Sequence, residues 1–411
     1  MAFRLHNITK PLLQKGARQH SGAMRCVVKG GTKSMAHIIA INHQGQRLKA
    51  CIGALLIGTT ALFTASTAPA SAQSAQRPGP LETYKDWVIG CDNIADCTAA
   101  SLLAPDGSIA ETFATLYIRR DAGPYGAIRM EIRLSDNHAG KADLLVDGVK
   151  YTASDISDTL ITISDDGRAS LLPAMLRGKA MQVQADGKII GSISLNGLSA
   201  ALRYMDAQQG RAGTVTALVA TGKLVATSVK AAPLPPVVQH LLPEKQKKAT
   251  SARLWQGERG QALAISGCAA EQTPESEAEI TWLSDKEELV LIPCGHGAYN
   301  FSYVPLIATG AAGRRNFKPA RFDYLPGWSE AGKISSLVNA VWDAQGAILS
   351  SYSKGRGIGD CGSTESYVWD GAVFHMIEKR EMKECRGAWD WIRLWTAQAK
   401  PMEKSSKKSA K

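Results

Sequence analysis

Six of the eight cysteines lie beyond residue 72, and they restrict the fold of this chain more than any other feature. They are Cys91, Cys97, Cys268, Cys294, Cys361 and Cys385. In an exported chain, an even number of cysteines is typical of a disulfide framework, and six allow 15 connectivities. If the chain folds as two separate domains, Cys91 pairs with Cys97 and the other four leave three options. We favour Cys268–Cys294 and Cys361–Cys385, because these pairs are near in sequence and suit hairpin geometry.

The N-terminal sequence indicates export. Two basic residues precede the apolar run 50–63 (ACIGALLIGTTALF), and residues 70–72 (ASA) form a small-residue cleavage site. This order is typical of a cleaved signal peptide, and the run is too short to span a membrane comfortably. We therefore expect residues 1–72 to be removed, with the true start at Met1 or Met35. The mature chain is then periplasmic or secreted, with no integral membrane span.

The net charge of +11 is concentrated in segments outside the expected folded body. Residues 1–72 hold nine Lys/Arg and no Asp/Glu, so the remainder carries only +2. The tail 400–411 holds five lysines and one acid, which leaves the body near −2. A nucleic-acid partner is therefore not expected, since the folded part has no excess of cations to neutralise phosphates. The lysine-rich tail is expected to be disordered and solvated.

A linker is predicted at 230–252. It contains four prolines and then the charged run 244–248 (EKQKK), so it is first stiff and then polar. The mature chain is long enough for two domains. We expect them at 81–229 and 253–399.

Both predicted domains have the pattern of antiparallel strands. In the first, residues 113–120 (FATLYIRR) and 128–134 (IRMEIRL) alternate apolar and polar side chains. Two short helices interrupt its strands, at 169–177 and 198–209, and we expect Asn196 to cap the second. We therefore predict a mainly β protein with two antiparallel β-sandwich-like or barrel-like domains, the first with one or two short helices.

The second domain holds eight of the nine tryptophans and shows strand after strand. Its expected strands include 262–268, 333–342 and 389–396. In the last of these, Trp389, Trp391 and Trp395 would fall on one face with an arginine between them. Such a face can bind a glycan or peptide, although core packing is the more economical explanation for most tryptophans.

The stretch 354–371 (KGRGIGDCGSTESYVWDG) begins with a run of three glycines, Gly355, Gly357 and Gly359, followed by a cysteine in the same loop and then by a strand. Glycines allow unusual backbone angles, and the cysteine is expected to staple the loop to a neighbour. A phosphate-binding loop would be followed by a helix, so a nucleotide site is not expected here.

The loop around residue 356 and the loop 294–300 could form a binding cleft if disulfides bring them together. The candidate binding residues are His296, Tyr299, Asn300, Lys354, Arg356, Asp360 and Trp369. The alternative is that both loops are only hairpin corners, which commonly contain glycine.

No catalytic residue, metal site or cofactor is predicted. The chain lacks a G-x-S-x-G elbow and an H-E-x-x-H motif. Zinc binding by Cys294 and His296 is disfavoured, because oxidising compartments favour disulfides over thiolate ligands. His296 and Asp360 could form an acid/base pair, but nothing in the sequence supplies a nucleophile beside them.

Two sets of motifs resemble known families. The first resembles the invasion-associated locus B family of exported proteins and comprises 84–97 (YKDWVIGCDNIADC), 176–179 (LRGK) and 194–202 (SLNGLSAAL). The second resembles DUF1176, an uncharacterised envelope family, and comprises 293–300 (PCGHGAYN), 354–362 (KGRGIGDCG), 367–371 (YVWDG) and 385–387 (CRG). The resemblance implies a periplasmic protein with an N-terminal β domain, and it carries no known catalytic residue.

These observations together predict an exported binding or interaction protein of the cell envelope, whose partner is an envelope protein, peptide or glycan. One alternative is an inhibitor or partner of a cell-wall hydrolase, which would insert the loop 354–360 into its target. A cryptic envelope hydrolase is a further alternative.

Overall fold

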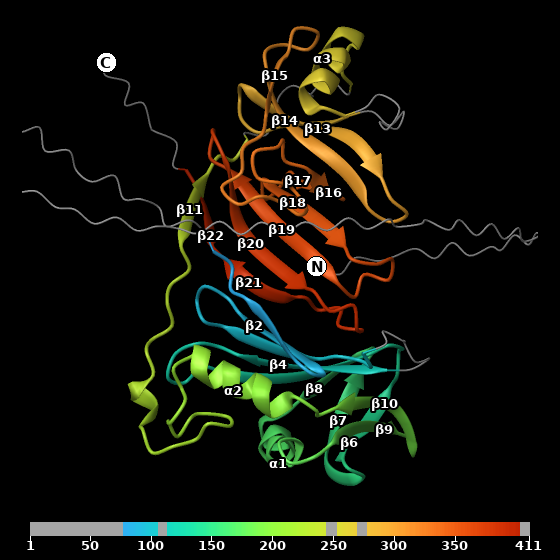
Figure 1. The fold of residues 1–411 in the computed structure, drawn as a ribbon, viewed down its shortest axis with the longest axis vertical. Coiled ribbons are helices and arrows are strands. Elements are labelled where there is room, and N and C mark those ends of the chain that lie inside the picture. The colour runs from blue at the N-terminus through green and yellow to red at the C-terminus, as the bar shows by residue number, and fades with distance from the viewer. Residues whose placement is uncertain (1–76, 106–112, 244–252, 269–277, 403–411) are drawn as a thin grey trace, which may run out of the picture. The chain divides into compact units, whose positions relative to one another are not determined.

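The computed structural model describes residues 77–105, 113–243, 253–268 and 278–402 (Figure 1). The expected signal peptide, the charged run 244–248 and most of the lysine-rich tail lie outside the described residues. All of the described residues belong to one compact unit.

The N-terminal half forms one antiparallel sheet of ten strands in the order β1-β2-β3-β4-β5-β8-β7-β6-β9-β10. The strands are β1 (Leu81–Tyr84), β2 (Trp87–Cys91), β3 (Cys97–Ser101), β4 (Ala114–Arg120), β5 (Ile128–Leu134), β6 (Gly140–Val146), β7 (Val149–Ser157), β8 (Leu160–Ile163), β9 (Ala180–Ala185) and β10 (Lys188–Ser194). The sheet folds over, because β10 at its edge lies against β4 near its middle.

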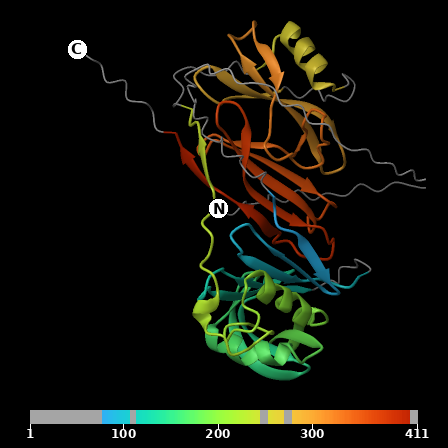
Figure 2. The same cartoon turned by 60° about the vertical axis from the view of Figure 1, so that its left-hand side comes forward.

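Two helices cover this sheet, α1 (Asp165–Met175) and α2 (Leu198–Gln208), and a short 3-10 turn, Ala226–Ser228, follows them (Figure 2). The expected cap of α2 is wrong: its N-cap is Gly197, with a left-handed φ of 103°, and no side chain caps the helix. Asn196 instead accepts a hydrogen bond from the backbone N–H of Asp86 through its backbone oxygen.

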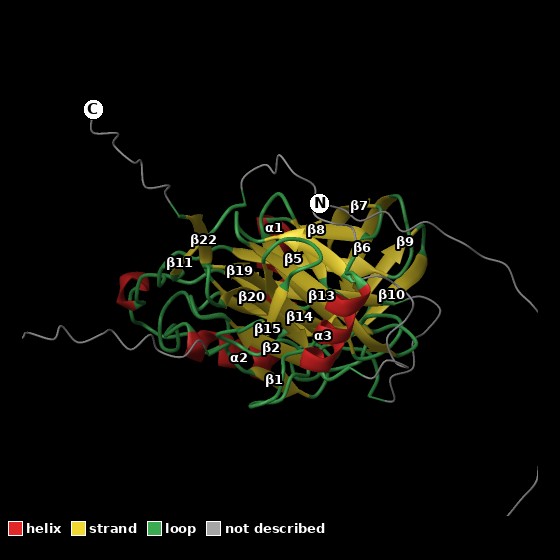
Figure 3. Ribbon diagram, turned by 90° about the horizontal axis from the view of Figure 1, so that it is seen from above, coloured by secondary structure: helices red, strands yellow, loops and turns green. Residues whose placement is uncertain are grey.

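The C-terminal half contains two further sheets (Figure 3). One comprises β12 (Glu279–Trp282), β13 (Glu287–His296), β14 (Phe301–Thr309), β15 (Asn316–Pro319) and β16 (Leu337–Val338). The other comprises β17 (Val341–Asp343), β18 (Ile348–Lys354), β19 (Gly362–Trp369), β20 (Phe374–Met382) and β21 (Ile392–Thr396). Apolar side chains of both sheets meet in one core, as in a sandwich, including Leu291, Ile307, Leu349 and Phe374.

Part of the expected linker is ordered on the C-terminal half. Strand β11 (Val237–His240) pairs in parallel with β22 (Gln398–Pro401), so the tail is structured as far as Pro401. The backbone N–H of Leu241 donates to the oxygen of Trp369 at 2.8 Å, and the Leu241 side chain packs on the core between the two C-terminal sheets.

The strand expected at 262–268 is wrong, because this segment lies in helix α3 (Gln256–Ser266). Glu258, Ala262 and Ser266 are its buried positions, and their spacing of four residues is helical. Glu258 accepts from the backbone N–H of Trp255 at 3.0 Å, which caps the helix, and it forms a buried ion pair with Arg315.

Two other expected strands are shorter than predicted. The segment 333–342 is divided into β16 and the start of β17, because Asn339 between them has a positive φ of 44°. Strand β21 begins only at Ile392, so Trp389 precedes it and does not share a strand face with Trp395.

The prediction of a mainly β protein with several antiparallel sheets is confirmed. The six cysteines beyond residue 72 form the three favoured pairs, Cys91–Cys97, Cys268–Cys294 and Cys361–Cys385. Within the described residues, no helix has the length and apolar character needed to cross a bilayer.

Strands β2 and β4 are buried on both faces, and this determines where the two halves meet. In β2, Trp87 and Ile89 enter the core under α2, whereas Val88 faces the C-terminal half. In β4, Tyr117 likewise faces the C-terminal half and packs near Ile392 of β21. Figure 1 shows β2 running beside β21 across this junction. One apolar layer, defined here as the junction core, therefore joins the two halves.

Three charged residues, His375, Asp323 and Asp370, connect three segments of the C-terminal half, and they are named the charged clip here. The imidazole of His375 on β20 contacts Asp323 through Nδ1 and Asp370 through Nε2, both at 2.8 Å. The hydrogen bond that His375 donates to Asp323 and its contact with Asp370 outweigh burial and raise the pKa of His375 to about 9. His375 is therefore an imidazolium at neutral pH and holds the two carboxylates together.

We predict that this clip stabilises the fold below the pKa of an unfolded histidine, about 6.5, and loses its effect as the pH rises through about 9. Wild type should be more stable than His375→Gln by about 1–3 kcal/mol at pH 6.5, and the gap should close by pH 9.5. Urea unfolding of both proteins across this pH range measures the gap. A gap that does not change with pH would contradict the assignment.

Candidate functional site

The two loops that were expected to approach each other do lie side by side. Asn300 donates through Nδ2 to the Lys354 backbone oxygen at 2.8 Å and accepts the Lys354 N–H at 3.1 Å. The Tyr299 hydroxyl donates to the Gly355 oxygen at 3.3 Å. Asn300 is buried, so its side chain fixes the two backbones to each other.

Asp360 is buried at the base of the loop 354–362, which is named the glycine loop here. It accepts from Arg356 Nε at 2.7 Å and from the Gly387 N–H at 2.8 Å. Burial alone would raise the pKa of Asp360, but these hydrogen bonds outweigh it and hold the pKa below its usual value. The carboxylate therefore links the glycine loop to the chain after Cys385, beside the Cys361–Cys385 disulfide.

Arg386, held between this disulfide and Gly387, docks the C-terminal half onto the N-terminal half. Its guanidinium donates to the backbone oxygens of Leu103 at 2.7 Å and Lys85 at 2.9 Å, and to the Asp86 carboxylate at 2.7 Å. Gly387 has a φ of +80°, and a Cβ there would lie 2.5 Å from the Leu103 side chain. The glycine loop therefore helps to hold Arg386 in the position in which it binds the N-terminal half. The contacts of Arg386 with Leu103, Lys85 and Asp86 are named the docking clamp here.

The structure places two of the predicted residues away from these contacts. His296 is exposed and stacks on Phe301, with ring centroids 5.7 Å apart. Trp369 is buried at the opposite end of β19 from the glycine loop, packs on Phe374 and donates to Glu287 at 3.2 Å. The two loops are therefore joined directly through Tyr299 and Asn300.

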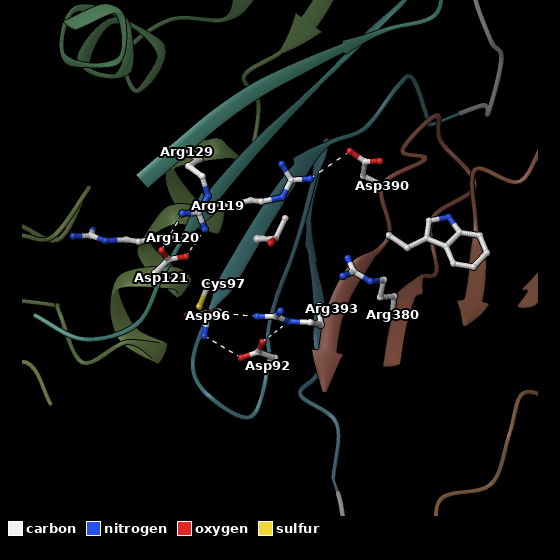
Figure 4. Close-up of a pocket in the computed structure, with 12 residues that line it drawn as sticks. Asp92, Asp96, Cys97, Arg119, Arg120, Asp121, Arg129, Arg380, Asp390 and Arg393 are labelled. Carbon is white, nitrogen blue, oxygen red and sulfur yellow. Dashed lines mark hydrogen bonds and ion pairs between the residues drawn. The ribbon is translucent and has the colours of Figure 1, made fainter. Parts of the chain in front are cut away.

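A different hollow lies where the N-terminal sheet meets β20 and β21, and it is here named the Arg–Trp crevice (Figure 4). It consists of two adjoining cavities of about 150 and 390 Å³. Four residues line both cavities: Arg119, Arg380, Asp390 and Trp391. The smaller cavity adds Asp92, Asp96, Arg129 and Arg393, and the larger adds Tyr352, Thr364 and Trp389.

Ion pairs cross the junction at the crevice. Arg393 on β21 donates to Asp92 at 2.7 Å and to Asp96 at 3.0 Å, both from the N-terminal half. Arg119 on β4 reaches Asp390 of the C-terminal half at 3.3 Å, as Figure 4 shows. Burial raises the pKa of Asp92 although Arg393 opposes the shift. Perturbed carboxylates of this kind are enriched at functional sites.

The larger cavity has an aromatic wall. Trp389 is 40% exposed and packs on Phe113 with the two ring planes tilted by 54° and the centroids 5.0 Å apart. Trp391 stacks on Tyr352 at 4.9 Å, and its indole N–H has no hydrogen-bond acceptor among the described residues. Trp395 belongs to the core between the C-terminal sheets, and its N–H donates to the Met376 oxygen.

Sequence reasoning missed most of this crevice. It pointed to Trp389 and Trp391, but not to Arg119 or Asp390, which come from opposite halves of the chain. One signal was available: in the alternating pattern FATLYIRR, Tyr117 and Arg119 fall on the face opposite Leu116 and Ile118, a polar face that needs a partner.

A further hollow of about 630 Å³ lies beside the N-terminus of α2. The three segments of the first motif set meet there, and they contribute Tyr84, Lys85, Lys179, Asn196 and Ser199 among others. None of these polar side chains is buried, so the hollow has little to fix the orientation of a ligand. The Arg–Trp crevice is the stronger candidate.

The described residues contain no group of three or more His, Cys, Asp or Glu side chains placed to hold a metal ion. The two members of the suggested acid/base pair are engaged separately, since Asp360 binds Arg356 and Gly387 while His296 lies on Phe301. The arrangement in the crevice is suited to binding.

We predict that Arg386→Ala destabilises the protein by about 3 kcal/mol, because it removes the ion pair with Asp86 and the hydrogen bonds to the partly buried carbonyls of Lys85 and Leu103. Lys383→Ala, which removes an exposed side chain nearby, should change stability by less than about 0.5 kcal/mol. Urea unfolding measures both. Equal effects of the two substitutions would show that the clamp does not hold the halves together.

The comparisons with known proteins give one family and two similar proteins. The model of DUF1176, described as a protein of unknown function, matches residues 81–398. Uncharacterized protein YpfG of Escherichia coli (strain K12) is 28% identical over 333 residues, which cover 76% of this chain and 91% of that protein. The crystal structure of invasion associated protein B from Bartonella henselae is similar with a TM-score of 0.25 and 19% identity, over 32% of this chain and 99% of that one. Since the family match runs from β1 into β22, this chain belongs to the DUF1176 family.

Proposed function

We propose that this protein is an exported binding protein of the cell envelope and that the Arg–Trp crevice is its binding site. The observation that carries the proposal is the larger cavity, about 390 Å³, which is lined both by an exposed indole and by guanidinium and carboxylate groups. Ligand sites of about 300–1,000 Å³ typically combine apolar walls with a few polar groups that fix orientation. Aromatic side chains that keep one face open are typical of glycan and peptide recognition.

The export part of the proposal is supported by the disulfides. All six cysteines among the described residues are paired, which suits an oxidising compartment. The apolar run 50–63 and the small residues 70–72 have the pattern of a signal peptide, which would direct the chain out of the cytosol.

A second candidate is an inhibitor of a cell-wall hydrolase, and one observation favours it. The glycine loop is braced at its base by the Gly355 N–H, which donates to the Cys361 oxygen at 2.8 Å, while Ile358 at its tip is 52% exposed. A braced loop with an apolar tip can enter the cleft of another protein at little entropic cost.

If the protein is exported as proposed, its native form will be recovered from the periplasmic or extracellular fraction with an N-terminus near Gln73. Alkylation without prior reduction should then label no cysteine in the mature chain. N-terminal sequencing and peptide mapping by mass spectrometry test both points. A cytosolic protein with an intact leader and free thiols would overturn this part of the proposal.

For the binding site, we predict that soluble fragments of the cell wall change the tryptophan fluorescence of the wild-type protein in a saturable way. Trp389→Ala should weaken this binding about tenfold, since it removes the exposed aromatic wall. Trp328→Ala, which removes another exposed indole outside the crevice, is the matched control and should bind like wild type.

The same variants separate the two candidates. If capture of an envelope protein survives Trp389→Ala but is lost in Ile358→Ala, the inhibitor function is favoured. Unchanged binding of wall fragments by Trp389→Ala would argue against the crevice.

A further inference from the structure

We infer that the Arg–Trp crevice takes an uncharged saccharide rather than an acidic polymer or a polycation. This inference rests on the proposed binding function and adds the chemical class of the ligand. It follows from the way in which the charges of the crevice are already paired.

Both arginines that line the larger cavity, Arg119 and Arg380, have acidic partners. Arg119 pairs with Glu131 and Asp390, and Arg380 pairs with Glu378. In the smaller cavity, Arg129 pairs with Asp121 and Arg393 with Asp92 and Asp96, whereas Nη1 of Arg120 lies 3.8 Å from Asp206 and has no hydrogen-bond partner among the described residues. An anionic ligand in the larger cavity would have to displace one of the carboxylates there and would then lie close to the others, and a cationic ligand would have to displace an arginine in the same way. Unit charges a few ångströms apart interact by about 1–4 kcal/mol near a protein surface, so neither exchange gains free energy overall.

The same pairs suit hydroxyl groups. A guanidinium that shares only some of its five N–H groups with a carboxylate still presents the others, and the carboxylate keeps further lone pairs. Arg119 and Asp390, 3.3 Å apart, therefore place a donor and an acceptor side by side. Vicinal hydroxyls of a sugar, each both a donor and an acceptor, match such a pair without bringing a net charge.

The aromatic wall supplies the complementary apolar contact. Trp389 is fixed from one side by Phe113, and its 40% exposure leaves part of the indole open to the larger cavity. The C–H face of a pyranose ring is flat and apolar, so it can cover an indole in the way another apolar group would. Tyr352 and Thr364, which line the same cavity, add hydroxyl groups.

Trp391 extends the aromatic wall. Its side chain lines both cavities, is 6% exposed and stacks on Tyr352 with ring centroids 4.9 Å apart.

The experiment compares two oligosaccharides of equal length by isothermal titration at 20 and 500 mM NaCl. Chitotetraose is uncharged, and tetragalacturonate carries a carboxylate on each sugar. We expect chitotetraose to bind the full-length mature protein with an affinity that changes less than twofold with salt. We expect tetragalacturonate to bind at least tenfold more weakly. Trp389→Ala should lose at least tenfold in affinity for chitotetraose, whereas Trp328→Ala should match wild type.

Two results would overturn the inference in different ways. Tighter binding of tetragalacturonate, weakening at high salt, would show that the crevice selects acidic ligands, and binding of wall-derived peptides alone would show that it selects peptides. In both cases the proposed binding function would stand and the ligand class would be wrong. If neither saccharide nor any wall fragment binds in a manner sensitive to Trp389→Ala, the binding function itself fails.

Discussion

The apolar layer between the two halves is the constraint on which the rest of the structure depends. Val88 on β2 and Tyr117 on β4 face away from the core of their own sheet and pack with Ile392 and Leu394 of β21. Because this contact fixes β4 against β21, Arg119 and Arg393 are brought to the same crevice from distant parts of the sequence. The site is therefore a product of sheet packing, and its geometry is only as rigid as the junction core.

The glycine-rich motif is explained by this junction better than by a ligand. Its aspartate, Asp360, holds the amide of Gly387, and its cysteine is bonded to Cys385, so Arg386 between them is fixed on both sides. Arg386 then satisfies backbone carbonyls and a carboxylate of the other half. A motif with unusual backbone angles, a cysteine and an ion pair suggests a ligand-binding site. In this protein, those features hold the side chain of Arg386 in position.

Local structure could be predicted from the sequence, whereas contacts between residues far apart in the chain could not. Alternation identified strand 128–134 with its observed limits, and proximity identified the three disulfides. Helix α3 was misread as a strand because its apolar residues were weighed without Glu258, whose burial beside Arg315 depends on tertiary contacts. The crevice was missed because Arg393 and Asp92 are 301 positions apart, and no periodicity in one segment reports a contact of that kind.

The burial of β2 on both faces has a consequence for how the chain folds as it is made. The strand emerges early from the ribosome, whereas β21, which covers its second face, is among the last elements to appear. During that interval the N-terminal sheet presents an apolar surface with no native neighbour, and the contact order of the finished fold is correspondingly high. Chains cut short before Arg386 lack β21 and would retain that apolar surface permanently.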